Sequence, residues 1–278
     1  MTLPSLLGLD LETPRIMGIL NITPDSFSDG GDLTGVADAV ARAKIMSSEA
    51  EILDIGGEST RPGAEPVAAA DEIARVVPVI AGIRDAGIRT PISVDTRKSV
   101  VAEAALDAGA DMVNDVSAGR YDSDMLPLVA ARNVPICLMH SVADPKTMQS
   151  HATYRDVVAE VRDHLQERIA AALDAGVTRD HLILDPGIGF GKTTQHNLSL
   201  LRAIPRYDVF ELPILIGASR KRFIGELGNA EGAKQRMAGS VAVALFAADR
   251  GARILRVHDT YETRQALSLH LALRTRDE

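Results

Sequence analysis

Length, composition and charge narrow the class of protein before any motif is considered. The chain has 278 residues, of which 46% are hydrophobic and only 3% aromatic, with no Trp. Such a core is aliphatic, as in parallel sheets covered by helices, and the length suits a single α/β barrel. A net charge of -8 gives no general basic field, which argues against nonspecific binding to nucleic acid or to an anionic membrane.

The hydropathy of the chain predicts a cytoplasmic protein. The stretch 1–18 lacks a basic region followed by an apolar one, and no segment reaches the roughly 18 apolar residues of a membrane span. The single cysteine, Cys137, excludes an intrachain disulfide. Because it lies in the apolar run "VPICLMH", we expect a buried thiol without a catalytic role.

Eight short aliphatic runs alternate with Ala-rich segments whose apolar residues recur at helical spacing. The runs occupy residues 15–23, 51–57, 90–96, 111–117, 134–140, 182–188, 212–219 and 252–259. This alternation predicts a TIM-type (β/α)8 barrel as a single domain over 1–278, with residues 1–14 as an extra segment that closes the barrel bottom. A doubly wound open sheet would give similar local signals, but the number of strands favours the barrel.

Polar residues end every one of these runs, where a core would exclude them. In a barrel these strand ends meet at the C-terminal mouth, the face on which the fold places its active sites. One such residue would be explained equally well by a helix cap or a turn. Eight in phase favour a functional site, made of Asn21, Asp54, Asp95, Asn114, Asp115, His140, Asp185, Ser219, Arg220, Lys221, Arg256 and His258.

The predicted mouth contains two kinds of chemistry. One end offers acceptors and an amide, which suit a flat heterocycle with several N–H donors: Asp54, Asp95, Asn114 and Asp185. The other end offers cationic and hydroxyl donors, and the loops after strands seven and eight form the usual phosphate site of such barrels. This anion end contains Arg61, Ser219, Arg220, Lys221, Arg256 and His258.

Two glycine-containing loops follow the first two strands, at 21–35 and 56–66. The second carries Thr60 and Arg61 and could hold a phosphate or carboxylate with its backbone, although an ordinary surface turn has the same composition. In the first, Asn21 could give an oxygen ligand to Mg²⁺, with water and a pyrophosphate completing the octahedron, and Asp25 and Asp29 are close enough in sequence to help. The sequence has no His–Glu or Cys cluster typical of zinc.

Seven segments of the chain resemble the signature segments of the dihydropteroate synthase family, in the family's order. They are "ILNITPDSFSDGG", "DIGGESTRPGA", "VDTRK", "NDVSAG", "LILDPGIGFGK", "GASRKRFIG" and "RVHD", and the resemblance runs from about Arg15 to Leu267. It implies a Mg²⁺-dependent transferase of folate biosynthesis. The implied reaction joins 6-hydroxymethyl-7,8-dihydropterin pyrophosphate and 4-aminobenzoate into 7,8-dihydropteroate and releases pyrophosphate.

The resemblance also implies a role for individual residues. The pterin ring would be held by Asp95, Asn114, Asp185 and Lys221, with Met139 and Phe190 as apolar walls. The pyrophosphate and its Mg²⁺ would be held by Asn21, Arg256 and His258, with Thr60 near the scissile bond. The aminobenzoate would contact Phe27, Thr60, Arg61, Pro62, Phe190, Ser219 and Lys221, which would make sulfonamides competitors. The residues implied to be catalytic are Asp95, Lys221, Arg256 and His258.

The carboxylate of Asp185 ends an apolar run and is followed by three glycines. An ordinary strand-to-helix turn would explain the glycines but leaves the carboxylate unexplained. In the implied site Asp185 would pair with donors of the pterin ring, and the glycines would let the backbone pass close to the ligand.

The chain departs from the family pattern in three places. The loop after "SDGG" is a few residues shorter, the segment after Met139 and His140 lacks an Arg-Gly pair, and Arg222 stands where some relatives have Ser. The first departure leaves open whether Asp25 or Asp29 binds metal. The third leaves open which donor meets the aminobenzoate carboxylate.

Two other functions agree with part of the pattern. A methyltetrahydrofolate:corrinoid methyltransferase-like barrel would share the pterin pocket, but "GGESTRPGA" and "SRKRFIG" argue against it. A catalytically silent pterin-binding paralogue is expected to have lost Arg61, Lys221 or His258, and this chain keeps all three. The small residues of segment 230–252, together with the resemblance, favour a homodimer, although a core helix would look the same in sequence.

Overall fold

Eight parallel strands form the centre of the computed structural model, which describes residues 6–22, 35–60, 63–143 and 147–274. The strands follow one another around the barrel, with hydrogen-bonded neighbours in the order β6-β5-β4-β3-β2-β1-β8-β7. Their bounds are β1 Arg15–Asn21, β2 Ile52–Gly56, β3 Ile92–Asp95, β4 Met112–Asp115, β5 Ile136–Met139, β6 Leu182–Asp185, β7 Leu215–Ile216 and β8 Ile254–Val257.

A short contact between β6 and the residues just before β7 completes the circle. Leu184 forms an isolated parallel bridge with Ile214, and the Leu184 amide donates to the Pro213 carbonyl over 2.9 Å. β7 has only two residues and is the shortest of the described strands. The eight expected runs each contain one strand, so the predicted (β/α)8 barrel is confirmed.

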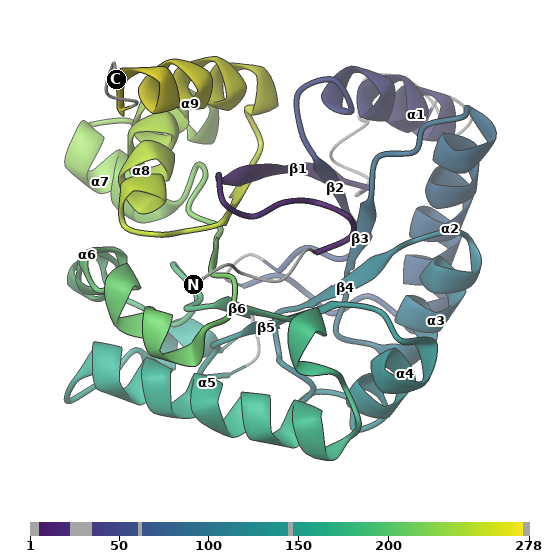
Figure 1. Ribbon diagram of the computed structural model, residues 1–278, viewed down its shortest axis with the longest axis horizontal. Coiled ribbons are helices and arrows are strands. Elements are labelled where there is room, and N and C mark those ends of the chain that lie inside the picture. Colours follow the sequence, from purple (N-terminus) through teal and green to yellow (C-terminus); the bar gives the residue numbers. More distant parts are fainter. Residues whose placement is uncertain (1–5, 23–34, 61–62, 144–146, 275–278) are drawn as a thin grey trace.

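Helices surround the strands in chain order, as a ring that Figure 1 shows from one end of the barrel. Their bounds are α1 Gly35–Met46, α2 Ala69–Asp85, α3 Ser99–Asp107, α4 Met125–Arg132, α5 Val157–Asp174, α6 Thr194–Arg202, α7 Arg222–Gly228, α8 Met237–Asp249 and α9 Thr260–Arg274. In the described part of the chain, four short 3-10 turns accompany them: η2 Met148–His151, η3 Arg179–His181, η4 Ile204–Phe210 and η5 Ala233–Arg236. None of the helices in the described part of the chain is long and apolar enough to span a membrane.

Local sequence explains where several helices begin and end. Asp156 starts α5 by accepting hydrogen bonds from the amides of Val158 and Ala159. Thr193 starts α6 in a capping box with His196. Asn133 ends α4 in the left-handed conformation, with φ at 52°. These local signals agree with the barrel topology, so the helices and the strands specify the same fold.

Two layers of aliphatic side chains form the core. The larger layer fills the space between the strands and the helices, and Val79, Ile80 and Ile83 of α2 are fully buried in it. The smaller layer lies inside the barrel at the N-terminal side of the strands. It contains Met17, Ile52, Met112, Cys137, Ile183, Leu215 and Ile254 from the strands.

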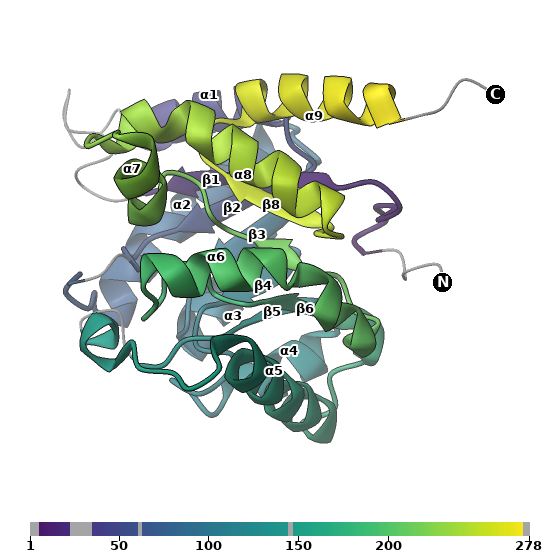
Figure 2. The same cartoon turned by 90° about the vertical axis from the view of Figure 1, so that its left-hand side faces the viewer.

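The N-terminal segment packs against this inner layer. Leu6 and Leu11 are each 1% exposed and belong to the same cluster as the strand residues inside the barrel. Figure 2 shows the described N-terminal residues and the end of α9 on the same side of the molecule. Both leucines are buried against this layer, while closure of the barrel bottom by residues 1–14 stays a prediction.

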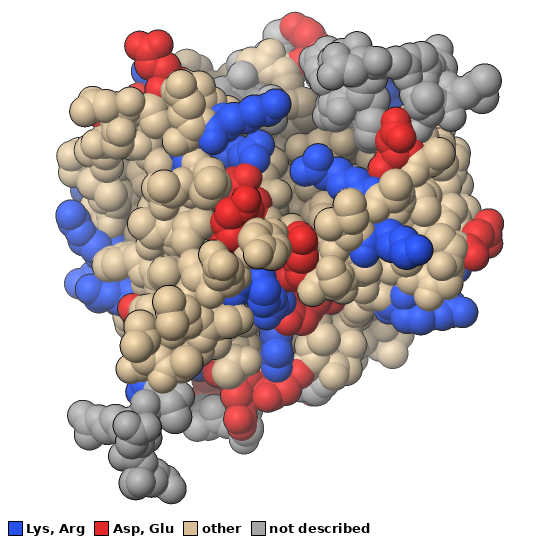
Figure 3. All heavy atoms as spheres, turned by 90° about the horizontal axis from the view of Figure 1, so that it is seen from above, with Lys and Arg blue, Asp and Glu red and all other residues tan. Residues whose placement is uncertain are grey.

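Acidic and basic side chains are interspersed on the face of the molecule that Figure 3 shows from above. Among the ion pairs of α9, Arg264 Nη2 lies 2.5 Å from Glu51 Oε1 and Arg274 Nη1 lies 2.7 Å from Asp249 Oδ1. An exposed pair such as Arg274–Asp249 contributes about 0 to 1 kcal/mol to stability. The stability of the fold therefore rests mainly on its two aliphatic layers.

Leu11→Ala tests the packing of the N-terminal segment. Loss of the buried side chain should lower the free energy of unfolding by about 2 to 5 kcal/mol, because a cavity would remain beneath the barrel. Urea unfolding followed by circular dichroism measures the change. The matched control is Leu269→Ala, because Leu269 is 62% exposed on α9. Equal costs for the two variants would contradict a structural role for the segment.

Candidate active site

A half-buried arginine holds two buried carboxylates together at the mouth of the barrel. Arg256 of β8 donates from Nε to Asp54 Oδ2 over 2.6 Å and from Nη2 to Asp95 Oδ2 over 2.6 Å. Asn114 of β4 adds a long hydrogen bond from Nδ2 to Asp54 Oδ2, at 3.5 Å. The side chains of β2, β3, β4 and β8 thus converge on one point, as expected from strand ends that share a face.

The second oxygens of both carboxylates have no partner among the described residues. Asp54 Oδ1 and Asp95 Oδ1 are buried and without a hydrogen bond. Buried polar atoms are usually satisfied, so an unsatisfied pair at a barrel mouth indicates a ligand with N–H donors. Burial raises the pKa of Asp95, the Asp54 carboxylate raises it further, and Arg256 opposes both. Hydrogen bonds from a ligand would compensate the free-energy cost of burying the Asp95 carboxylate.

Asp185 of β6 lies at the same mouth and shapes the loop that follows it. Its Oδ1 accepts a 2.7 Å hydrogen bond from the Gly187 amide, and burial raises the pKa of its carboxyl. Gly187 has φ at +70°, and a Cβ there would lie 1.9 Å from the His140 carbonyl oxygen. Only glycine fits this turn, because both the backbone conformation and the close approach exclude a side chain.

Lys221, at the N-terminus of α7, approaches the same loop from the other side. Its Nζ donates to the Ile188 carbonyl and lies 4.5 Å from the centroid of the Phe190 ring. Burial lowers the pKa of Lys221 to about 8, and the nearby Asp185 carboxylate limits the decrease. The lysine therefore remains mostly charged at neutral pH and links Asp185 to the aromatic wall.

Lys192 is a buried lysine beside the same loop, which the sequence did not single out. It is 4% exposed, and its Nζ lies 2.9 Å from His140 Nδ1 and donates to the Phe190 carbonyl over 3.0 Å. Burial lowers the pKa of Lys192 to about 7. Burial and the neighbouring Lys192 lower the pKa of His140 to about 2, so the imidazole is neutral. The pair fixes the turn that carries Phe190.

The loops after β7 and β8 are tied together. Ser219 Oγ accepts a 3.2 Å hydrogen bond from the His258 amide and lies 3.0 Å from His258 Nδ1. Arg220 forms a two-point ion pair with Asp259, with Nε 3.0 Å from Oδ2. The hydroxyl, the imidazole and the guanidinium are therefore close to one another, as predicted for the anion end.

Some of the remaining predicted residues lie in the described part of the chain and others lie outside it. Asn21 ends β1. A Cβ placed on Gly56 would lie 3.7 Å from Asn21 Oδ1 and 3.7 Å from Asp95 Oδ2. The Asn21 amide is therefore beside the carboxylate cluster. Met139 is buried at the end of β5, and Thr60 is half-buried after β2. The other predicted residues lie outside the described part of the chain: Phe27, Arg61 and Pro62, as well as Asp25 and Asp29.

The structure differs from the sequence analysis in how it arranges the charges. The sequence suggested an acceptor end and a separate anion end, with Arg256 in the second. Instead Arg256 lies against Asp54 and Asp95, since β8 is separated from β2 only by β1 and its side chain reaches across. Within the described ranges, no group of three or more His, Cys, Asp or Glu side chains could hold a metal ion.

Comparison with known proteins identifies the family. Residues 17–258 match the family described as pterin binding enzyme. The dihydropteroate synthase of Escherichia coli strain K12 is 46% identical over 261 residues, which make up 94% of this chain and 92% of that protein. The chain belongs to the dihydropteroate synthase family.

Solved structures agree with this membership. A dihydropteroate synthase from Xanthomonas albilineans, solved with 4-aminobenzoic acid, is 48% identical, with a TM-score of 0.92 over 99% of this chain and 98% of that one. The enzyme of the same organism in complex with 7,8-dihydropteroate is 47% identical, with a TM-score of 0.88 over 97% of each chain. The fold and the family thus agree over almost the whole chain.

The pH dependence of stability tests the burial of Lys192. Its pKa is 10.5 when unfolded and about 7 when folded, so between these values the unfolded chain binds more protons. The contribution of Lys192 to stability should therefore rise as the pH rises from 7 toward 10 and be lost as the pH falls through 7. In urea unfolding at several pH values, the free energy of unfolding of the wild type should increase with pH relative to Lys192→Met.

Lys234→Met, at an exposed position on η5, controls for the loss of one lysine. A difference between wild type and Lys192→Met that stays constant across this pH range would mean that Lys192 keeps its proton in the folded protein.

Proposed function

We propose that this chain condenses 6-hydroxymethyl-7,8-dihydropterin pyrophosphate with 4-aminobenzoate to 7,8-dihydropteroate and pyrophosphate. One observation carries the proposal beyond family membership. Asp54 and Asp95 each present a buried, unsatisfied oxygen at the mouth of the barrel, beside Asp185, Asn114 and Arg256. This arrangement matches the N–H donors and ring acceptors of a reduced pterin.

The pterin would lie over the carboxylate cluster. Asp95, Asn114 and Asp185 would pair with the polar edge of the ring, and Lys221 would donate to a ring acceptor. Met139, at the end of β5, and Phe190 would form apolar walls. The hydrogen bonds of Lys192 and the contact with Lys221 support a fixed position of the Phe190 loop.

The reaction needs charge stabilisation more than proton transfer. The C–O bond to the pyrophosphate would break first, the electron pair would leave with the pyrophosphate, and the ring would delocalise the cation left on the exocyclic carbon. The amine of 4-aminobenzoate would then attack this carbon and lose a proton. Asp95 and Asp54 would stabilise the positive charge on the pterin, and Ser219 and Thr60 would lie on the side of the second substrate.

Arg256 and His258 would receive the leaving pyrophosphate. The guanidinium has five N–H donors, and contacts on its Nε and Nη2 leave Nη1 for a phosphate oxygen. His258 is positioned by Ser219, which links it to the loop after β7. The bound pyrophosphate would also balance the positive charge of Arg256 once the pterin has become a cation.

Mg²⁺ fits this site as an ion shared with the pyrophosphate. The described residues offer it one amide oxygen, Asn21 Oδ1, beside the carboxylate cluster. Mg²⁺ commonly keeps several waters and binds through few protein ligands plus substrate phosphates, so a single protein oxygen is consistent with it. When bound, the ion would neutralise charge on the leaving group.

An exposed apolar side chain on α8 supports the proposed homodimer. Phe246 is 38% exposed, whereas Ser240 and Ala244 of the same helix face the core. Exposed apolar groups on a helix of small residues allow close packing against a second copy.

The primary test is an assay of dihydropteroate formation. The purified chain receives the dihydropterin pyrophosphate with and without 4-aminobenzoate and Mg²⁺, and the product is identified by mass. Dihydropteroate should form only when both substrates and Mg²⁺ are present, and EDTA should stop its formation, because the pyrophosphate would lose its counter-ion. Binding of the pterin without formation of dihydropteroate would contradict the proposed activity.

Asp95→Asn tests the electrostatic role of the carboxylate. The change keeps the shape of the side chain and removes its charge, so kcat should fall about 10²- to 10³-fold while binding of pyrophosphate changes much less. Steady-state kinetics measures the first quantity and calorimetric titration with pyrophosphate the second. An unchanged kcat would exclude Asp95 as a stabiliser of the cation.

A further inference from the structure

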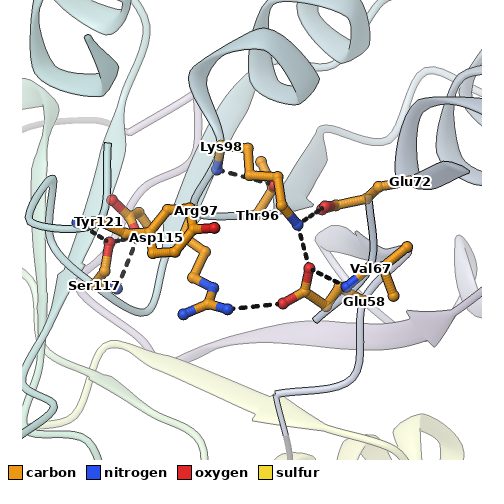
Figure 4. A network of polar contacts seen from close by, with 9 residues as sticks. All are labelled: Glu58, Val67, Glu72, Thr96, Arg97, Lys98, Asp115, Ser117 and Tyr121. Carbon is orange, nitrogen blue, oxygen red and sulfur yellow. Dashed lines mark hydrogen bonds and ion pairs between the residues drawn. The ribbon is translucent and has the colours of Figure 1, made fainter. Parts of the chain in front are cut away.

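A buried network of four charged side chains lies beside the site and has no part in the mechanism above (Figure 4). Glu58, Glu72, Arg97 and Lys98 are between 1% and 7% exposed. Lys98 Nζ donates to Glu58 Oε2 and, over 2.6 Å, to Glu72 Oε2. Arg97 Nη2 donates to Glu58 Oε1 over 3.0 Å. The network links the loop after β2, the first residues after β3 and helix α2.

The central member, Glu58, connects both ends of the loop that carries Thr60. Glu58 precedes residues 59–66, and its Oε2 accepts a 3.3 Å hydrogen bond from the amide of Val67, which follows them. The same oxygen accepts from Lys98, and the other accepts from Arg97. One carboxylate therefore joins the start and the end of this loop to the end of β3.

The charges of the network are balanced. Two carboxylates face two cations, and the directions of the pKa shifts of Glu58 and Lys98 agree with an ion pair between these two side chains. Burial alone would raise the pKa of Glu58, but Lys98 and Arg97 outweigh burial and lower it. Burial alone would lower the pKa of Lys98, but Glu58 and Glu72 outweigh burial and raise it. Removing one member would leave an uncompensated charge in the interior.

Such a network is a costly way to obtain stability. Apolar residues of similar volume are often as stable as a buried ion pair or more so, because the charges lose their hydration. What the ions add here is geometry, since hydrogen bonds restrict direction as well as distance. Arg97 is restricted further, because its guanidinium carbon lies 4.2 Å from the centroid of the Tyr121 ring.

The backbone beside Glu58 is held on its other side as well. Arg75 of α2 donates from Nη1 to the Gly57 carbonyl over 2.8 Å. A Cβ on Gly57 would lie 2.9 Å from Val76 Cγ1 and 3.2 Å from the Glu72 carbonyl oxygen, so α2 packs directly on this backbone. The start of the loop is thereby fixed between α2 and the end of β3.

We propose that Glu58 is a positioning residue for the second substrate. Held by Lys98 and Arg97, its carboxylate fixes both ends of the loop and thereby places Thr60 at the mouth of the barrel. This inference rests on the proposed function for the identity of the second substrate, 4-aminobenzoate. Glu58 acts through the loop and makes no contact with the reacting atoms.

Glu58→Gln tests the inference, with Glu58→Asp as the variant that keeps the charge. In the full-length chain, Glu58→Gln should raise the KM for 4-aminobenzoate and lower kcat. Together these changes should lower kcat/KM for 4-aminobenzoate about 10- to 100-fold, the usual effect of a small misplacement. The KM for the dihydropterin pyrophosphate should change little. The kcat/KM of Glu58→Asp should lie between those of the wild type and Glu58→Gln, because the shorter Asp side chain keeps the charge but cannot reach all three donors.

A measurement without substrates accompanies the kinetics. Hydrogen–deuterium exchange of peptides covering 58–67 should become faster in Glu58→Gln, while exchange in β5 stays the same. The neutral Gln side chain offers one acceptor oxygen, instead of two charged ones, to the three donors Val67, Arg97 and Lys98. Unchanged exchange in 58–67 would overturn the inference even if the kinetics changed. If neither the wild type nor Glu58→Gln makes dihydropteroate, but exchange in 58–67 is faster in Glu58→Gln than in the wild type, the role of Glu58 in the loop is supported. Only the proposed function is then rejected.

Asp111→Asn is the matched control. Asp111 Oδ2 lies 2.5 Å from Arg84 Nη2 and accepts from the Ile92 amide, at the N-terminal ends of β3 and β4 and away from the mouth. The Asp111→Asn variant should have a lower melting temperature than the wild type but the same KM for 4-aminobenzoate. If Asp111→Asn and Glu58→Gln raise that KM equally, the effect is general loosening and Glu58 is not a positioning residue.

Discussion

The ion pairs of Arg256 are the interaction on which the mouth of the barrel depends. Without this guanidinium, Asp54 and Asp95 would be two neighbouring buried carboxylates with no cation beside them, an arrangement that costs free energy through burial and mutual repulsion. With it, each carboxylate has one oxygen paired with Arg256, while the other oxygen, Oδ1, is buried without a hydrogen-bond partner among the described residues. The cost of burying these charges is thus offset by one cation from β8, which meets carboxylates from β2 and β3.

The same principle recurs around the mouth, with a different cation for each loop. Lys221 compensates Asp185 and touches the Phe190 ring, and Arg220 pairs with Asp259. Each pair joins side chains from different strand-loop units, so the ion pairs also define how the loops lie relative to one another. A rigid strand scaffold and charge-paired loops together give a preorganised site.

The sequence predicted the fold and the convergence of polar side chains at the strand ends because both depend on periodic signals. Aliphatic runs that end in polar residues mark strands and their mouth, and Asp54, Asp95, Asn114 and Asp185 converge there as expected. The partners of these residues could not be predicted. Lys192 and Lys98 stand next to loops, where a lysine is usually solvated, and only the three-dimensional packing shows that both are buried.

The buried position of Cys137 has a consequence for spectroscopy. The thiol lies within the inner layer of the barrel, and burial together with the charges of Asp185 and Asp54 raises its pKa well above the usual range. It is therefore a poor nucleophile toward maleimides in the folded protein. A cysteine introduced on a mouth loop would be the only reactive thiol of the native chain, so one fluorophore or spin label could report on that loop without removal of the natural residue.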